Sequence, residues 1–404
     1  MPDFIFCLLC MSTSRIWRAL IVVIFTLFLC MPISASYGIS NAPKNQVNPT
    51  AKNGILDLSG LDFDRTGAVK LDGEWEFYWN RLLDPEDFTI AQPVSPEGYY
   101  PVPLFWTGYS GLDLPSQGCA TYRLRVLTDD FPRPLSIRTP EIFSEYALWI
   151  NGKLIDRHGS FAGGPIRFLK PDVFSFPSHD RTVEIVLQIK NTSHGNAGIG
   201  QSFFLGAPET ISRSFNHAVI LEIFLIAICL FSGFYHLVLF SFRRNEKELL
   251  HFGLFCIILA TRTLFTGTTY IMQVFPDMPF GGGSRIATAT IPLSVITFIS
   301  FVYYFFKPLI NQAFFRGVLG VHVLYLILIP VSTTFFYSTL FSWYLVLIGL
   351  TGIYAIVIIV SAVVKAYPYA RIFLGGFVFV FIGFINDTLH YMQIINTGYQ
   401  MALW

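Results

Sequence analysis

The sequence predicts an exported β domain followed by a bundle of membrane helices, and two observations support this fold class. Residues 217–404 are almost entirely apolar, and the whole chain is 53% hydrophobic and only 13% charged, against about 25% charged for an ordinary soluble domain. Residues 40–213 instead carry short alternating runs bounded by Pro, Gly and Asp, a pattern typical of many short strands. We therefore expect a β-sandwich or jelly roll joined to a polytopic helical bundle.

The apolar half contains six runs that are each long enough to cross a bilayer. A hydrocarbon core about 30 Å thick needs roughly 20 apolar residues per helix. The six runs lie near residues 217–240, 249–272, 286–306, 317–336, 340–363 and 372–395. Residues 396–404 read as a turn and the first residues of another span. The sequence thus predicts six complete spans plus the start of a seventh, in a domain over 214–404 that is truncated in its seventh helix.

The N-terminus has the features of a targeting segment. Arg15 and Arg18 precede the apolar run Ala19–Met31, and Ser34-Ala35-Ser36 offers a small-x-small cleavage pattern. We expect a signal peptide over 1–36, with an uncleaved anchor helix as the alternative. Both interpretations place the following residues outside the cell membrane, beginning with a flexible leader over 37–54.

The distribution of basic residues predicts the same orientation independently. The connections after the first, third and fifth spans carry Arg243, Arg244, Lys247, Lys307, Arg316, Lys365 and Arg371, whereas the connections after the second and fourth hold only Arg285. Positively charged connections stay in the cytoplasm. Residues 37–215 are therefore expected on the outside.

Residues 55–213 form the predicted exported domain. Short runs read as strands at 69–71, 74–79, 121–127, 135–139, 146–150, 153–155 and 183–189. Asn151-Gly152 lies between two of these runs, and this dipeptide is the usual signal for a type I′ hairpin turn. Many short strands without long helical periods favour the jelly roll.

Composition and spacing argue against several kinds of chemistry. A formal net charge of +1 gives no field for binding nucleic acid. The eight histidines are scattered without zinc-type spacing, and Cys119 is the only cysteine in the exported domain. Gly281-Gly282-Gly283 lacks the Lys-Ser/Thr of a phosphate loop. We expect no metal, no cofactor and no enzymatic activity within this chain.

Aromatic, amide and charged side chains of the exported domain are candidates for binding a small molecule, because sugars are held by aromatic faces and hydrogen-bonding groups. The candidates are Trp106, Arg138, Trp149, His158, Asn191, His194 and Asn196. The alternative is that the tryptophans fill the core and the loop residues are simply solvated.

Polar residues inside the spans form a second set of candidates, because an intramembrane ionisable group is costly and usually has a partner. The predicted network comprises Glu222, His236, Arg262, Asn386 and Asp387. We expect Arg262 halfway along the second span, at a depth similar to Asp387, and hypothesise an ion pair or a shared network between them. The alternative is that each is satisfied separately.

Several motifs together resemble a known family. They are Leu71–Trp79, Trp149–Lys153, Asn191–His194, Gly233–His236, Leu249–Gly253 with Arg262, and Asn386-Asp387. With the order of domains, they resemble bacterial seven-transmembrane receptors with diverse intracellular signalling modules (7TMR-DISM), whose periplasmic domain is a galactose-binding-like jelly roll. The resemblance covers about residues 55–404.

That resemblance implies a multi-pass sensory receptor of the bacterial inner membrane. It implies a periplasmic, carbohydrate-like small-molecule ligand and a cytoplasmic effector, such as a diguanylate cyclase or histidine kinase, that is absent from this chain. The alternative function is a transporter or membrane enzyme with an accessory exported domain, which the lack of a clear internal repeat disfavours. Besides the lipid bilayer, ligand and effector, a second copy of the chain is a candidate partner.

Overall fold

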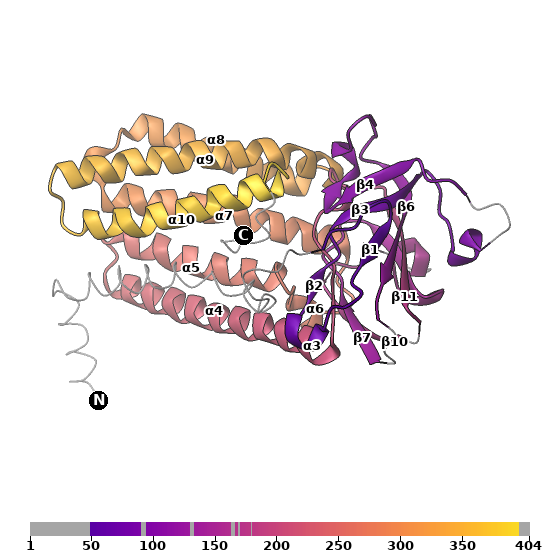
Figure 1. The fold of residues 1–404 in the computed structure, drawn as a ribbon. Coiled ribbons are helices and arrows are strands. Elements are labelled where there is room, and N and C mark those ends of the chain that lie inside the picture. Colours follow the sequence, from indigo (N-terminus) through magenta and orange to yellow (C-terminus); the bar gives the residue numbers. More distant parts are fainter. Residues whose placement is uncertain are drawn as a thin grey trace.

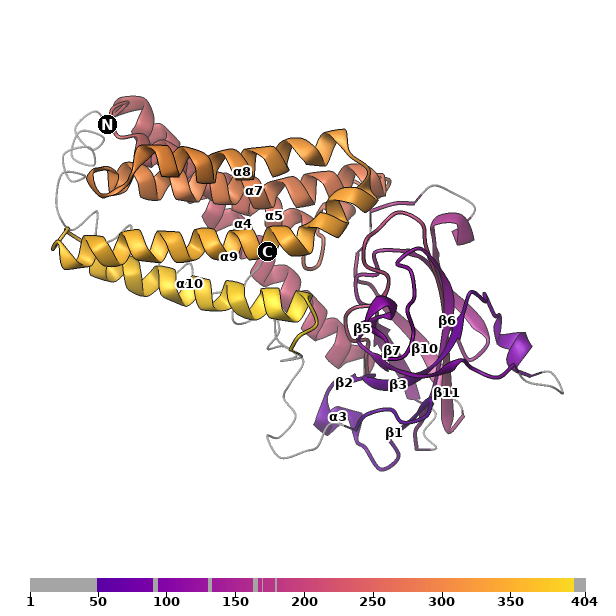
Figure 2. The same cartoon turned by 90° about the horizontal axis from the view of Figure 1, so that it is seen from above.

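The computed structural model describes residues 49–89, 94–129, 133–162, 166–168, 170–178 and 180–395. The predicted signal peptide, most of the leader and the predicted start of a seventh helix lie outside these residues. The chain has two parts, a β region and a helical bundle, and the β region lies at one end of the bundle (Figures 1 and 2). The helix ends next to the β region are called the near ends here, and the opposite ends the far ends.

The β region is built on a seven-stranded sheet. Its strands follow the order β4-β3-β6-β11-β8-β9, and β1 pairs with β6 in parallel while the other neighbours are antiparallel. The strands are β1 (Ile55–Asp57), β3 (Gly73–Trp79), β4 (Gly98–Val102), β6 (Gly118–Leu127), β8 (Glu145–Ile150), β9 (Lys153–His158) and β11 (Thr182–Asn191).

A second sheet packs across the first and makes a sandwich. Its order is β10-β7-β13-β2, and a short third sheet pairs β12 with β5. The strands are β2 (Val69–Lys70), β5 (Leu104–Phe105), β7 (Arg133–Arg138), β10 (Val173–Ser178), β12 (Gly198–Ile199) and β13 (Phe204–Gly206). Short helical turns connect them at α3 (Phe63–Thr66), η3 (Pro85–Phe88), η4 (Trp106–Gly108) and η5 (Gly159–Ala162).

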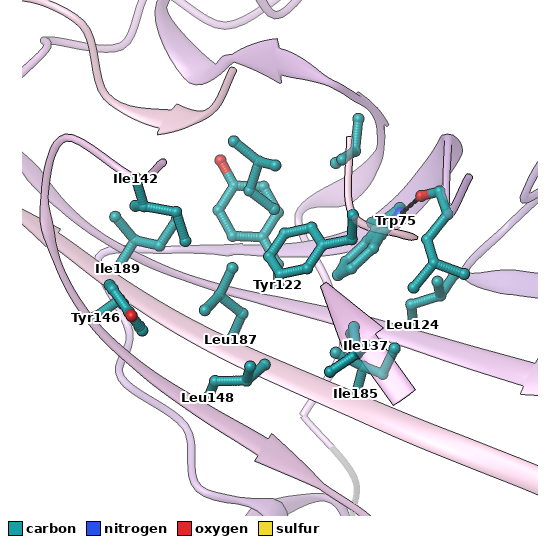
Figure 3. Packing of buried hydrophobic residues seen from close by; sticks show 14 of the residues in the cluster. Trp75, Tyr122, Leu124, Ile137, Ile142, Tyr146, Leu148, Ile185, Leu187 and Ile189 are labelled. Carbon is teal, nitrogen blue, oxygen red and sulfur yellow. Dashed lines mark hydrogen bonds between the residues drawn. The ribbon is translucent and has the colours of Figure 1, made fainter. Parts of the chain in front are cut away.

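The core of the sandwich lies between the two larger sheets. Trp75, Leu124 and Ile185 of the large sheet and Ile137 of the small sheet are all fully buried in one cluster (Figure 3). Alternate strand residues point into this core, so burying them favours this pairing register over a one-residue slip. The predicted β-sandwich is confirmed.

The predicted hairpin turn is also confirmed. Asn151 and Gly152 have φ values of 50° and 73°, both in the left-handed region. They connect β8 to β9, which pair antiparallel. A type I′ turn needs positive φ at both central residues, and Asn-Gly meets that need at low cost.

Six helices of the bundle are long and apolar enough to cross a membrane. They are α4 (Pro208–Phe242), α5 (Lys247–Phe265), α7 (Phe280–Phe305), α8 (Gln312–Val331), α9 (Thr334–Val364) and α10 (Ala370–Tyr391), with the short α6 (Ile271–Val274) between α5 and α7 and the 3-10 turn η6 (Lys307–Leu309) between α7 and α8. The six predicted spans are confirmed as helices, although each has different bounds, and two of the differences bear on the site.

The first of these differences is at α4. This helix has 35 residues and begins at Pro208, nine residues before the predicted span. At about 1.5 Å per residue it is roughly 52 Å long, well over a hydrocarbon core. The first turns of α4 pack against the β region, and Ile211 in these turns is 1% exposed. The same helix therefore runs without a break from the β region into the bundle.

The second difference is at α5, which ends at Phe265, seven residues before the predicted end. The following turn has positive φ at Gly267 and Thr269, of 69° and 52°. The Glu222 carboxylate on α4 accepts hydrogen bonds from the Thr268 amide at 3.0 and 3.2 Å and from the Thr268 hydroxyl. This long-range contact satisfies donors beyond the helix end and fixes the turn. It also places Arg262 in the last turn of α5, not halfway along it.

A close crossing of α4 and α5 depends on two glycines. A Cβ on Gly233 would lie 2.7 Å from Ile257 Cγ1 and 3.1 Å from the Gly253 carbonyl oxygen. A Cβ on Gly253 would lie 3.0 Å from the Gly233 carbonyl oxygen. Small residues let membrane helices approach closely and gain dispersion contacts.

The connections rich in Lys and Arg all lie at the far end of the bundle (Figure 1).

Candidate functional site at the joint between the two regions

The β region meets the near ends of the helices at an extensive joint. Three of its segments form most of this joint, namely 138–143, 166–168 and 193–196. Each comes from a loop or a strand end of the sandwich, and loops carried by a rigid scaffold are common sites of function. The joint is the candidate functional site of the described residues.

Segment 166–168 pairs with the connection between α6 and α7. The Phe168 amide donates to the Met278 carbonyl at 2.7 Å, and the Phe280 amide donates to the Ile166 carbonyl at 3.0 Å. These two bonds make a small antiparallel bridge across the joint. Backbone bonds of this kind fix the two segments in register.

The Phe168 side chain reaches into the bundle. Its ring lies 6.0 Å from the ring of Phe265 at the end of α5 and 6.5 Å from that of Phe280 at the start of α7. A Cβ on Gly283 would lie 2.5 Å from this ring. The third glycine of Gly281-Gly282-Gly283 is therefore explained by packing, since only a residue without a side chain leaves room for Phe168.

Segment 193–196 contacts the last two helices. The Gly195 amide donates to the Ser338 hydroxyl on α9 at 2.9 Å, and Asn196 Nδ2 donates to the Tyr391 hydroxyl on α10 at 3.0 Å. A Cβ on Gly195 would lie 2.9 Å from the Thr339 amide nitrogen. This segment thus lies directly against the helix backbone.

Apolar packing continues through the joint without a break. The buried cluster that contains the sandwich core also contains Phe265, Ile271, Met272 and Phe280 from the near ends of the bundle. The Gln393 side chain, just past α10, accepts a hydrogen bond from the Phe105 amide at 3.0 Å. Packed interiors are dense and transmit displacement, so a movement of the sandwich at this surface also displaces the helix ends.

Four charged residues on the two sides of the joint are coupled electrostatically in two pairs. Glu141 in the loop after β7 interacts electrostatically with Arg262 of α5, and Arg138 at the end of β7 interacts with Glu222 of α4. Each pair has one member in the β region and one in the bundle. The Arg138 guanidinium lies over the rings of Phe204 and Phe215, at 5.8 and 5.7 Å from their centres.

The structure gives Arg262 and Asp387 different partners. Arg262 Nη1 donates to the Ala287 carbonyl at 3.1 Å and to the Thr290 hydroxyl at 3.2 Å, both on α7. Asp387 is 1% exposed and accepts from Asn386 Nδ2 at 3.0 Å. These contacts hold Arg262 on α7 and Asp387 beside Asn386. The hypothesis of an Arg262–Asp387 ion pair or shared network stays a prediction.

The other predicted intramembrane residues are bound locally. His236 is 4% exposed, and its Nδ1 lies 2.8 Å from the Ser232 carbonyl of the preceding turn. Its ring packs edge-on against Phe252 of α5, at 4.6 Å between centres. The contacts described for the five predicted residues are Glu222 with Thr268, His236 with Ser232, Arg262 with α7, and Asn386 with Asp387.

The predicted ligand-binding residues divide by burial. Trp106 is fully buried, and its indole nitrogen donates to the Pro115 carbonyl at 2.8 Å. Asn191 is 1% exposed and fixes the following loop by donating to the Ser116 and His194 carbonyls at 2.8 and 2.7 Å. The partly exposed members are Arg138, Trp149, His158 and Asn196.

The two histidines of this set are held in loops. His194 stacks on Phe143 at 4.9 Å, and its Nδ1 lies 3.0 Å from the Asn196 carbonyl. Burial lowers the pKa of His194 to about 4, opposed by that hydrogen bond. Burial also lowers the pKa of His158, whose Nε2 lies 2.8 Å from the Arg167 carbonyl. His194 is therefore neutral at ordinary pH.

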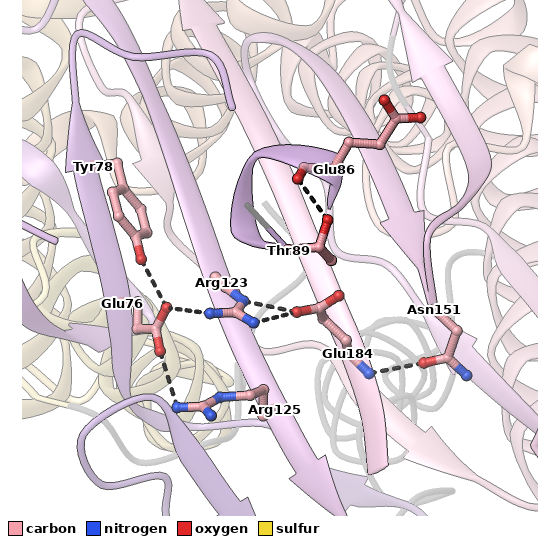
Figure 4. Close-up of polar contacts among 8 residues, drawn as sticks. All are labelled: Glu76, Tyr78, Glu86, Thr89, Arg123, Arg125, Asn151 and Glu184. Carbon is pink, nitrogen blue, oxygen red and sulfur yellow. Dashed lines mark hydrogen bonds and ion pairs between the residues drawn. The ribbon is translucent and has the colours of Figure 1, made fainter. Parts of the chain in front are cut away.

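A separate charged cluster lies on the opposite face of the large sheet, away from the core. Arg123 contacts Glu184 at 2.8 Å and Glu76 at 3.3 Å, and Arg125 contacts Glu76 at 3.2 Å (Figure 4). The Tyr78 hydroxyl donates to Glu76 at 2.8 Å. These contacts are short and join β3, β6 and β11, which indicates a structural role.

Sequence reasoning missed a buried histidine in the bundle. His322 of α8 has no exposed surface, and its two ring nitrogens lie 2.9 Å from the Tyr344 and Thr351 hydroxyls of α9. Tyr344 also stacks on Tyr325 at 3.8 Å. The signal in the sequence was a single histidine within an otherwise apolar span. The following span carries the hydroxyl residues Tyr344 and Thr351 that contact it.

Residues 218–403 match the family described as 7TM diverse intracellular signalling. The match covers slightly less than half of the chain, and the membrane half is similar to that family. The described helices α4–α10 supply most of the matched segment. No curated protein matches the chain.

Solved structures similar to the chain are bacterial glycosidases. A β-glucuronidase from Ruminococcus gnavus in complex with uronic isofagomine has a TM-score of 0.27 and 17% identity, over 35% of this chain and 29% of that one. A GH2 β-galacturonidase from Eisenbergiella tayi bound to galacturonate has a TM-score of 0.25 and 13% identity, over 35% of this chain and 24% of that one. The chain thus spans under a third of these enzymes.

The 7TM diverse intracellular signalling assignment agrees with where the joint lies. The matched segment begins at residue 218 within α4, which itself starts at Pro208. Five helices of the matched segment contact the β region at the joint, namely α4, α5, α7, α9 and α10. Each makes this contact through its near end or the adjoining turn. The family region therefore receives its contacts from the β region along one surface.

Proposed function

We propose that the protein is a transmembrane sensory receptor in which the β region detects a ligand and the joint passes its state to the helices. The observation that carries this proposal is the joint itself. Segments 166–168 and 193–196 bond to α6–α7 and to α9–α10, on two different sides of the bundle. A change in the sandwich would shift these helices relative to each other, which is a common means of switching.

The ligand in this proposal is a small carbohydrate-like molecule. Arg138, Trp149, His158 and Asn196 keep exposed surface and supply aromatic, cationic and amide groups suited to hydroxyls and ring faces. Arg138 and Asn196 lie in joint segments, so a ligand held there would compete with or reinforce contacts to the bundle. Trp106, Asn191 and His194 would support the same loops from within.

The proposed location is the bacterial inner membrane, with the β region in the periplasm and an effector in the cytoplasm. The far-end connections carry Lys and Arg, consistent with a cytoplasmic position. Alkaline phosphatase fused after Gly282 should be active, and fused after Lys247 inactive. The reverse pattern would overturn the proposed orientation.

Ligand response can be tested with the full chain in lipid nanodiscs. Glucose, galactose, N-acetylglucosamine and glucuronate would each be added while intrinsic tryptophan fluorescence follows thermal unfolding. A sensor predicts that a sugar which raises the melting temperature also changes proteolytic cleavage near residues 334–341. Uptake of that sugar into proteoliposomes, without such a change, would instead support the transporter alternative.

A further inference from the structure

The basic residues at the far end of the bundle have two different surroundings. Three of them lie in or beside the α4–α5 connection together with two acidic residues, and this group comprises Arg243, Arg244, Glu246, Lys247 and Glu248. The Arg243 guanidinium contacts the Glu246 carboxylate at 3.3 Å. Most of the positive charge of this connection is therefore compensated by its own acidic residues.

The rest of the far end lacks such compensation. No Asp or Glu occurs between residues 278 and 386, a described stretch that contains α7, α8, α9 and most of α10. Four basic residues of this stretch are exposed at the far end, namely Lys307, Arg316, Lys365 and Arg371. We call these four residues the cationic surface. Uncompensated positive charge attracts anionic partners.

Apolar packing brings two connections of this surface together. Phe306 directly precedes Lys307 and has no exposed surface. Its ring lies 6.4 Å from that of Tyr367, in the α9–α10 connection, and 5.8 Å from that of Phe373 on α10. The turn that carries Lys307 is thus packed against the connection that carries the other two cations of α9 and α10.

The remaining members of the surface are anchored in the same way. Phe315 directly precedes Arg316 and stacks on Tyr303 of α7 at 4.1 Å. Ala370 directly precedes Arg371 and has no exposed surface. Phe306, Phe315 and Ala370 belong to one buried cluster. The exposed charges therefore project from backbone positions that are fixed relative to one another.

Exposed apolar side chains lie beside these charges. Val364 and Ile372 directly adjoin Lys365 and Arg371, and they are 80% and 43% exposed. Phe314 lies two residues before the cation of α8 and is 57% exposed. A soluble acidic partner would match only the charges. A phospholipid matches both features, because it joins an anionic headgroup to apolar acyl chains.

We propose that the cationic surface binds anionic phospholipid, whose phosphates are held by Lys307, Lys365 and Arg371 while its acyl chains lie along α9 and α10. Lys and Arg form charge-assisted hydrogen bonds with phosphate oxygens, and basic sites between membrane helices suit such headgroups. The three cations come from two connections, so a lipid with two phosphates would bridge both connections. Arg316 lies at the edge of this site.

The inference goes beyond the proposed function, because the site lies at the opposite end of the bundle from the joint. It concerns a lipid partner and does not depend on how the β region detects a ligand. Its failure would leave the receptor proposal standing, and failure of the receptor proposal would leave the lipid site standing.

The experiment titrates the full chain, in micelles of a neutral detergent, with cardiolipin, a phospholipid that carries two phosphates. Native mass spectrometry counts the bound lipid. Cardiolipin should bind more tightly than zwitterionic phosphatidylcholine, and an equal concentration of inorganic phosphate should not displace it. Equal binding of the two lipids would overturn the proposal. Displacement by a poly-glutamate peptide at lower concentration than by phosphatidylglycerol would also overturn it, in favour of an acidic protein partner.

Two combined variants separate a defined site from general charge attraction. Replacing Lys307, Lys365 and Arg371 with Gln should weaken cardiolipin binding on the order of 100-fold, because each basic residue near an anionic surface contributes roughly fivefold in affinity. Replacing Arg243, Arg244 and Lys247 with Gln removes the same charge from the same end and should leave binding nearly unchanged. Equal losses in the two combined variants would overturn the proposal.

Folding is checked separately from binding. Both combined variants should keep the wild-type melting temperature in phosphatidylcholine nanodiscs, because Lys307, Lys365 and Arg371 are exposed. If the first combined variant unfolds, the three single variants Lys307→Gln, Lys365→Gln and Arg371→Gln decide the question. Each should weaken cardiolipin binding about fivefold, and wild-type affinity in all three would contradict the proposed site.

Discussion

Two groups of carboxylates and guanidiniums in the described part of the protein are arranged in opposite ways. On the outer face of the large sheet, Glu76, Arg123 and Glu184 are joined by contacts of 3.3 Å or less. At the joint, Glu141 and Arg262 are coupled only electrostatically, and among the described residues no contact within 4.0 Å joins them. The cluster on the outer face holds three strands in fixed positions. The pair at the joint leaves the β region able to take two positions against the bundle.

This difference locates where the molecule can change at low cost. Breaking a short buried ion pair leaves an uncompensated charge and is expensive. Separating two charged groups that are not in contact costs little free energy, especially when the carboxylate can take up a proton. The outer face of the sheet is thus a rigid element, and the joint is the place where a signal can be expressed.

The largest effect is expected at the rigid cluster. Glu76 is 4% exposed and accepts from Tyr78, Arg123 and Arg125. Glu76→Leu should destabilise the β region by about 3 kcal/mol, because it removes three hydrogen bonds to one charged group at once. Denaturant unfolding followed by tryptophan fluorescence measures this. Glu74→Leu, at an exposed position of the same strand, is the control, and equal losses in both variants would refute the structural role of the cluster.

The next largest effect is expected at the α4–α5 crossing. Gly233→Leu forces a side chain against Ile257 and the Gly253 carbonyl, and overpacking of this kind costs about 1–3 kcal/mol. Thermal unfolding in detergent should show a clearly lowered midpoint. Gly320→Leu on α8, where a Cβ would meet nothing within 4 Å, should change the midpoint little. If both leave it unchanged, the crossing is not as close as described.

A smaller effect is expected at Arg262, in contrast with Glu76. Arg262→Met removes two hydrogen bonds to α7 but also a costly buried charge, and Glu141 can bind a proton in response. The net change in unfolding free energy should be within about 1 kcal/mol, since apolar replacements of buried charges are often neutral. A loss of 3 kcal/mol or more in the same detergent assay would show that the joint charges form a tight pair after all.

The smallest effect is expected for a single neutral hydrogen bond across the joint. Asn196→Ala and Tyr391→Phe each remove the 3.0 Å bond between β region and α10, and such a bond contributes about 1 kcal/mol. The double variant should lose no more than the larger single change, because both remove the same contact. Fully additive losses would mean that the two side chains act independently.

The sequence predicted elements that depend on local pattern. Six apolar runs became six helices, and Asn151-Gly152 became the expected turn, because span length and positive φ are properties of neighbouring residues. The end of α5 was mispredicted because it depends on Glu222, which lies 46 residues before Thr268. An apolar run cannot reveal that a carboxylate from another helix fixes its end.

The joint could not be predicted for the same reason. Phe168 and Gly283 are more than a hundred residues apart, and only their packing shows why the glycine is needed. Asn196 stood out as a polar loop residue, but its partner Tyr391 gave no signal in an apolar span. The sequence indicated which residues had useful chemistry, whereas the fold decided which of them meet.

The central claim is that the joint behaves as one unit, and breaking one side of it tests this most directly. Gly283→Val places a side chain against Phe168 at the α7 contact, while Gly282→Val, where a Cβ would meet nothing within 4 Å, is the matched control. Hydrogen exchange would be read at the other side, in peptides covering 193–196, 334–341 and 386–391. We predict faster exchange there in Gly283→Val and wild-type exchange in Gly282→Val. Faster exchange confined to residues near the substitution would contradict the account.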